Sequence, residues 1–211
     1  MTPMMTSPVP RVPTTTQATT YGYDASIARF SVEQYQGMIE AGILTGEDKV
    51  ELLENYVVLK MSRNPPHDST IQQMLERIFL LRPPGWSFRV QSAIVLRDSQ
   101  PEPDFALVLG SALNYKTRHP NPSEVALVIE VADSSLLRDQ RDKTRIYARA
   151  GIPIYWIANL VDNRIEVYTL PSGPTNVPAY GMFQVFAPGD VIPLTLDGVV
   201  VASVPVAELL L

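Results

Sequence analysis

The chain has 211 residues, of which 45% are hydrophobic and 18% charged, a composition typical of a folded domain rather than a disordered chain. It has no cysteine, which excludes disulfides and cysteine-ligated zinc, and its net charge of −5 argues against gripping duplex nucleic acid by charge alone. No apolar run approaches the roughly 20 residues of a membrane span, and no secretory signal begins the sequence, so we expect a cytoplasmic protein without membrane association.

The beginning of the sequence predicts a tail and then a domain. Residues 1–25 are rich in Thr and Pro and show little apolar periodicity, so we predict a disordered tail there. One folded domain is predicted over residues 26–211. Its first helix is expected to begin after Ser31, whose side chain can cap it, and to end at Gly42.

The remaining elements predict a mixed fold. Residues 49–61 are expected to form a hairpin around the turn Glu54–Asn55. Apolar residues at helical spacing predict a helix over residues 67–81 and a second over residues 137–150, which Gly151 ends. Apolar runs predict strands over residues 86–96, 105–109, 125–131, 153–158 and 164–170. This order is typical of an α/β (α+β) domain with a central mixed sheet flanked by helices.

Two acidic residues adjoin strongly apolar strands. Asp104 immediately precedes the predicted strand 105–109, and Glu130 lies at the end of the apolar run 125–131. A carboxylate at the end of a buried strand is costly to desolvate unless it is paired or binds a cation. A magnesium ion between the two would offset both the desolvation and their mutual repulsion. The alternative is that both acids lie at solvated strand ends and bind nothing.

Lys143 follows Glu130 across a predicted loop. Asp139 could cap the helix that starts there, which would put Lys143 about one turn into the helix, on the face shared with Tyr147 and Ala150. From that position the lysine could orient or deprotonate a water molecule, or stabilise the charge on a phosphoryl group. The alternative is an ordinary surface lysine.

These residues are part of a longer pattern. Its segments are Pro103–Asp104, Glu130–Val131, Asp139–Lys143 and Tyr147–Trp156, preceded by Val50–Asn55 and His67. Together they resemble the signature of the Uma family of restriction endonucleases, which belongs to the PD-(D/E)XK nuclease superfamily. The resemblance extends over about residues 28–205, and the run from Tyr147 to Trp156 is its most specific part.

The resemblance implies a restriction-endonuclease-like core and a metal-dependent endonuclease that hydrolyses nucleic-acid phosphodiester bonds, with DNA favoured. It makes Asp104 and Glu130 ligands of Mg²⁺, for which Mn²⁺ could substitute, together with the Val131 carbonyl. Lys143 becomes the catalytic lysine, displaced onto the helix because Ala132 stands where the superfamily's usual lysine would be, and Glu51 becomes a further catalytic acid. A homodimer is expected by analogy.

Some features leave alternatives open. Asn55 replaces the glycine usual in the first hairpin, and Asp133 replaces a serine, where it could repel phosphate. A catalytically inactive nuclease-fold module that binds nucleic acid or a protein partner is therefore the competing hypothesis, and a regulatory role with a partner protein is a weaker one. His67 is interpreted as a capping or packing residue, with substrate contact as its alternative.

Overall fold

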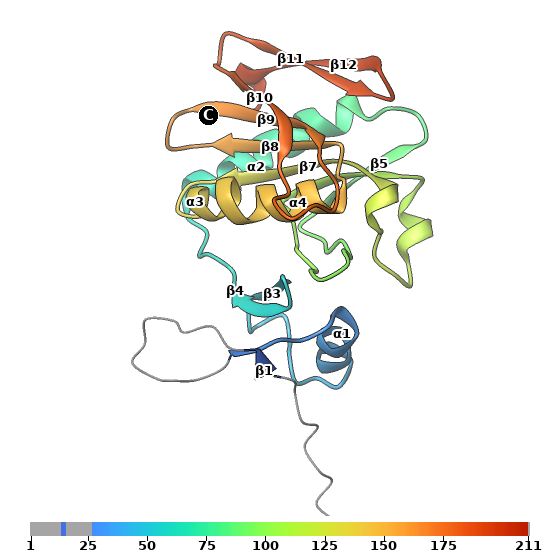
Figure 1. Cartoon of the computed structure of the whole chain (residues 1–211). Helices are drawn as coiled ribbons and strands as arrows, with labels where there is room; N and C mark the ends of the chain where they lie inside the picture. Colours follow the sequence, from blue (N-terminus) through green and yellow to red (C-terminus); the bar gives the residue numbers. More distant parts are fainter. Residues whose placement is uncertain (1–13, 16–26, 211) are drawn as a thin grey trace, which may run out of the picture.

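The computed structural model describes residues 14–15 and 27–210 (Figure 1). The predicted tail, residues 1–25, lies outside the described residues apart from β1 (Thr14–Thr15), which pairs antiparallel with β2 (Ile27–Ala28). None of the helices in the described part of the chain is long and apolar enough to cross a membrane.

The first helix and hairpin form where the local sequence predicts them. Helix α1 (Val32–Glu40) begins with a capping box in which Ser31 and Gln34 exchange hydrogen bonds. Strands β3 (Val50–Leu53) and β4 (Tyr56–Leu59) pair antiparallel around Glu54 and Asn55. Both turn residues have positive φ, 50° and 68°, as a two-residue hairpin turn requires, and asparagine tolerates this conformation without glycine.

A six-stranded mixed sheet forms the centre of the domain. Its order is β10-β9-β8-β7-β6-β5, with β7 and β8 parallel and every other neighbouring pair antiparallel. All eight residues of β7 are buried, as expected for a central strand covered on both faces. The strands are β5 (Trp86–Val90), β6 (Phe105–Leu109), β7 (Val125–Ala132), β8 (Ile154–Asn159), β9 (Arg164–Pro171) and β10 (Tyr180–Phe186).

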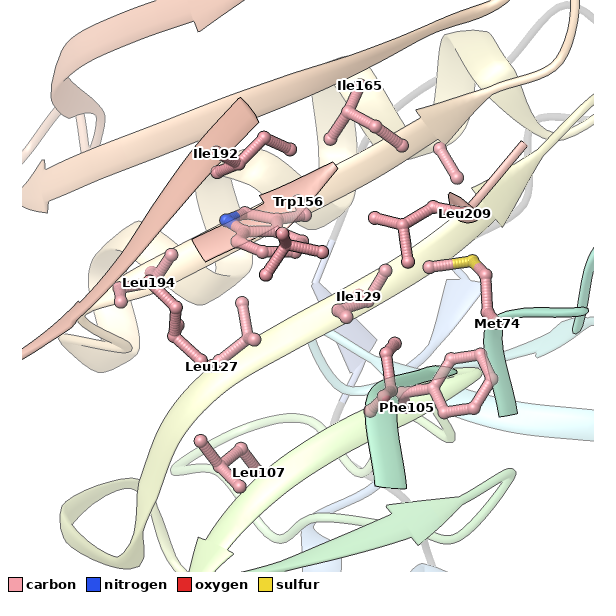
Figure 2. Close-up of a cluster of buried hydrophobic side chains, with 14 of the residues drawn as sticks. Met74, Phe105, Leu107, Leu127, Ile129, Trp156, Ile165, Ile192, Leu194 and Leu209 are labelled. Atoms are coloured by element: carbon pink, nitrogen blue, oxygen red, sulfur yellow. The ribbon is translucent and has the colours of Figure 1, made fainter. Parts of the chain in front are cut away.

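Two layers cover the sheet on opposite sides (Figure 1). Helix α2 (Pro65–Ile78) and the hairpin of β11 (Val191–Leu196) and β12 (Val199–Pro205) pack on one face, where Trp156 lies at the centre of the apolar cluster (Figure 2). Helix α4 (Thr144–Ala150) packs on the other face. Short 3₁₀ turns are η1 (Phe79–Leu81), η2 (Ala112–Tyr115), η3 (Pro122–Glu124) and η5 (Val206–Glu208). The predicted fold class, a central mixed sheet flanked by helices, is confirmed.

Two predicted boundaries are wrong. Strand β5 ends at Val90 and not at residue 96, because Gln91 takes a left-handed φ of 46° that interrupts the strand. Helix α2 begins at Pro65, and its cap is Asn64, whose side chain accepts the backbone N–H of His67 at 3.1 Å. The His67 side chain is therefore not the cap.

The helix predicted over residues 137–150 is also more complex than expected. It consists of α3 (Leu136–Arg138), a π-helical turn (Asp139–Lys143) and α4, joined end to end. Asp139 lies inside this helical stretch and does not cap it. Gly151 ends α4 with a φ of 75°, as the sequence predicts.

Candidate active site

The four residues proposed for catalysis line one small cavity of about 70 Å³. Glu51 comes from β3, Asp104 immediately precedes β6, Glu130 lies in β7 and Lys143 ends the π-helical turn. The fold thus brings together residues that are far apart in the sequence. Other residues that line the cavity are Lys60, Met61, Ser62, Arg63, Asn64, His67, Glu102, Val131, Asp133, Ser134, Ser135, Arg138 and Asp139.

The floor of the cavity consists of the buried charged side chains that line it, and Lys143 lies among the acids. These side chains are Glu51, His67, Asp104, Glu130, Asp139 and Lys143. Its Nζ donates to Glu130 Oε1 at 2.9 Å and lies 3.7 Å from Glu51 Oε1, and all three side chains are at most 8% exposed. Tyr147 donates its hydroxyl to the same Glu130 oxygen at 2.7 Å. Lys143 and Tyr147 therefore share the helix face that the sequence assigns to them.

Asp104 lies beside Val131 at the start of β6. Its Oδ2 accepts the Val131 backbone N–H at 2.9 Å, and His67 Nε2 lies 3.5 Å from the same oxygen. Because the N–H and C=O of a strand residue point to the same side of the strand, the Val131 carbonyl also faces Asp104. His67 thus contacts a proposed metal ligand. The sequence interpretation considered capping, packing and substrate contact for His67, but not this contact.

Asp139 is a site residue that the sequence interpretation missed. It is 2% exposed, its Oδ1 lies 3.9 Å from Lys143 Nζ, and its Oδ2 accepts the Ser135 hydroxyl at 2.6 Å. The spacing of four residues to Lys143 was the available signal. An acid just before an amphipathic segment is also typical of a helix cap, which is the interpretation that the sequence favours.

Excess negative charge surrounds the single buried ammonium. Burial raises the pKa of Glu130 to about 8, although Lys143 opposes the shift, and neighbouring acids add to it. Burial likewise raises the pKa of Asp139 to about 6 against the influence of Lys143. For Lys143, burial would lower the pKa, but Glu130, Glu51 and Asp139 outweigh it and hold the pKa above its ordinary value. The lysine is thus an ammonium at neutral pH.

His67 and Asp133 complete the surroundings. Burial would lower the pKa of His67, but its hydrogen bond to Asp104 and the charge of that carboxylate raise the pKa above the ordinary value. Asp133 accepts a hydrogen bond from the Asn64 side chain, which joins the loop after β7 to the residue that caps α2. The unexpected acid at position 133 therefore has a structural partner.

The donor atoms suit a hard cation that retains part of its water shell. Within the described part of the chain, no three Asp, Glu or His side chains converge as a ready-made metal centre. Magnesium commonly takes only one or two carboxylates, and water and substrate phosphate complete its octahedron. The hydrogen bonds given above use Glu130 Oε1 and Asp104 Oδ2, so each carboxylate has a second oxygen to offer beside the Val131 carbonyl. The residues fit such an ion.

Comparison with known proteins shows a family match and a similar solved structure. The model of the Uma2 family, described as "Putative restriction endonuclease", matches residues 32–204. The fold is similar to that of a crystal structure from Anabaena variabilis titled "a putative nuclease belonging to DUF820", with a TM-score of 0.63 and 14% sequence identity over 85% of this chain and 97% of that one. No curated protein matches the chain significantly.

Proposed function

Since the chain belongs to the Uma2 family of restriction-endonuclease-like proteins, we propose that it is a metal-dependent nuclease that hydrolyses nucleic-acid phosphodiester bonds, with DNA as the favoured substrate. The observation that carries the proposal is the buried Lys143 ammonium, 2.9 Å from Glu130 and 3.7 Å from Glu51 in the cavity that also contains Asp104. A buried lysine among several acids in a cavity is typical of functional sites, and its positive charge can stabilise a phosphoryl group.

Asp104, Glu130 and the Val131 carbonyl would hold Mg²⁺, or Mn²⁺ in its place. A divalent ion there would supply Lewis-acid activation of water and of a phosphoryl oxygen. Because Lys143 remains protonated at neutral pH, it acts as a hydrogen-bond donor and a positive charge and not as the base. Its place in the reaction is next to the charge that develops on the phosphoryl oxygens.

Three neighbouring side chains orient these groups. Glu51 accepts the backbone N–H of Glu102 at 3.3 Å through Oε2 and faces Lys143 through Oε1, so it fixes the direction of the ammonium. Tyr147 fixes the Glu130 carboxylate through its hydroxyl. His67 restrains Asp104 from the side of α2. Such restraints hold catalytic groups in one geometry before substrate arrives.

The test combines cleavage and metal binding. Purified protein is incubated with plasmid and oligonucleotide DNA and RNA in Mg²⁺ or Mn²⁺, and metal binding is measured by calorimetry. We expect cleavage by the natural protein, its loss in Asp104→Asn and Lys143→Met, and full cleavage in Lys116→Ala, a control that changes an exposed lysine outside the cavity. If the natural protein shows no cleavage and no heat of Mn²⁺ binding, the result supports the inactive binding module instead. The expected homodimer stays a prediction that light scattering tests.

A further inference from the structure

The mouth of the cavity carries cations above the acidic floor. Lys60, Arg63 and Arg138 line it, from the end of β4, the segment before α2, and α3. Lys60 forms an ion pair with Glu102. Arg63 and Arg138 take part in no ion pair with a carboxylate among residues 14–15 and 27–210, so their charges remain available to a ligand.

Arg138 is held across the opening. Its Nη1 donates to the backbone carbonyl of Leu59 at 2.8 Å, which joins α3 to the end of β4. The hydrogen bond from Asn64 to Asp133 joins the same two walls a short distance away. A guanidinium has five N–H donors, so one anchored donor fixes its position while the others can bind a second group. The arginine is therefore already oriented for a ligand at the mouth.

Charge balance indicates what that ligand is. The floor holds the acids Glu51, Asp104, Glu130 and Asp139, against Lys143 and a histidine. Each phosphate of a nucleic-acid strand adds one negative charge, and only the phosphate above the metal and Lys143 is offset there. Its neighbours in the strand need cations at the mouth. Because Lys60 is already paired, Arg63 and Arg138 are the cations that remain.

We propose that Arg63 and Arg138 bind the backbone phosphates that flank the scissile phosphate, and so position the strand over the floor. The proposal rests on the proposed nuclease function, since it assumes that the scissile phosphate lies above Glu130 and Lys143. Arginine suits this task because its planar fork matches phosphate geometry and keeps its charge at any working pH. Both residues are positioning residues whose role is seen in binding.

The experiment measures binding under conditions that prevent cleavage. Fluorescently labelled duplex and single-stranded oligonucleotides are titrated by anisotropy in Ca²⁺, at several salt concentrations. Removing one phosphate contact lowers the slope of log K against log salt by about 0.9 for duplex or 0.7 for a single strand, and weakens duplex binding about eightfold at 0.1 M salt. We expect this change in Arg63→Ala and in Arg138→Ala.

Controls separate this inference from loss of folding and from failure of the nuclease proposal. Arg77→Ala removes an exposed arginine ten residues beyond His67 on α2, about 15 Å along the helix from the cavity, and should bind as the natural protein does. Arg138→Lys keeps the charge and should recover the salt slope. If the loss in Arg138→Ala came from local unfolding, Arg138→Lys would not recover it. If the natural protein cleaves but both alanine variants keep its affinity and slope, the inference is overturned while the nuclease proposal stands. If the slopes fall as expected but nothing is cleaved, Arg63 and Arg138 still bind backbone phosphates, but the nuclease proposal fails and with it their placement beside a scissile phosphate.

Discussion

Replacing Glu130 by glutamine should change how stability depends on pH in the metal-free protein. The pKa of Glu130 is about 8 in the fold against an ordinary 4.5, with burial as the main cause. Between these values the unfolded chain has lost the proton while the folded protein keeps it, so the stability that the protonated group contributes is lost as pH rises towards 8. Each pH unit of this regime lowers the free energy of unfolding by about 1.4 kcal/mol.

The comparison is made between pH 6 and 8, above the range in which Asp139, with its pKa of about 6, adds most of its own effect. Over those two units Glu130 should account for a loss of about 2–3 kcal/mol, which Glu130→Gln removes while its amide oxygen still accepts from Lys143 and Tyr147. Other titrating groups, His67 among them, contribute to both proteins and cancel in the difference.

Urea unfolding in EDTA, followed by circular dichroism at half-unit steps of pH, gives the two curves. The free energy of unfolding of the variant, relative to that of the natural protein, should rise steadily from pH 6 to 8. Parallel curves would show that Glu130 ionises in the fold as easily as in water. That result would refute the claim that burial and neighbouring acids raise its pKa. Saturating Mn²⁺ should then stabilise the natural protein far more than the variant at pH 8, because a bound ligand stabilises only the form that binds it.

Three further results are expected. Lys143→Met should lower the cleavage rate about a hundred- to a thousandfold while Mn²⁺ binding remains measurable by calorimetry, because the ammonium acts on phosphoryl charge and is not a ligand; retention of the full rate would refute its role. Ile129→Ala, at a fully buried position of β7, should lower the free energy of unfolding by about 2–5 kcal/mol in urea titrations, and a loss under 1 would contradict the packing described. Gly151→Ala should lower the free energy of unfolding by about 1 kcal/mol, because φ is 75° there. Gly37→Ala, on an exposed turn of α1 with open space around its Cβ, should raise the free energy of unfolding by a similar amount. Changes of the same sign in the two variants would contradict the backbone assignment.

Elements that depend on short-range chemistry could be predicted from the sequence. The turn at Glu54–Asn55, the end of α4 at Gly151 and the buried strand β7 all follow from residues within a few positions of each other. The end of β5 could not be predicted, because glutamine rarely adopts the left-handed backbone conformation that Gln91 has. Here the surrounding structure, in which its N–H donates to the Asp104 carbonyl at 3.0 Å, decides the conformation.

The π-helical turn was beyond the sequence for a different reason. Apolar periodicity distinguishes a helix from a strand, but one wider turn shifts the pattern by a single residue and is lost within it. Asp139 and Lys143 lie at the two ends of this turn, and both side chains line the cavity that contains Glu130. The candidate residues could thus be chosen from the sequence, whereas the fourth acid of the floor needed coordinates.

The helical layer, and not β7, supplies the lysine that contacts Glu130. Ala132 follows Glu130 by two positions in β7, so their side chains lie on the same face of the strand. Ala132 is fully buried in the cluster that contains Ile146 and Tyr147, which leaves no room for a lysine stem at that position. Because Lys143 reaches the Glu130 oxygen at 2.9 Å from the layer above, the ammonium stands beside the carboxylate without any long side chain leaving the strand. What the chemistry requires is the position of the charged group, and the fold can meet that requirement from either layer.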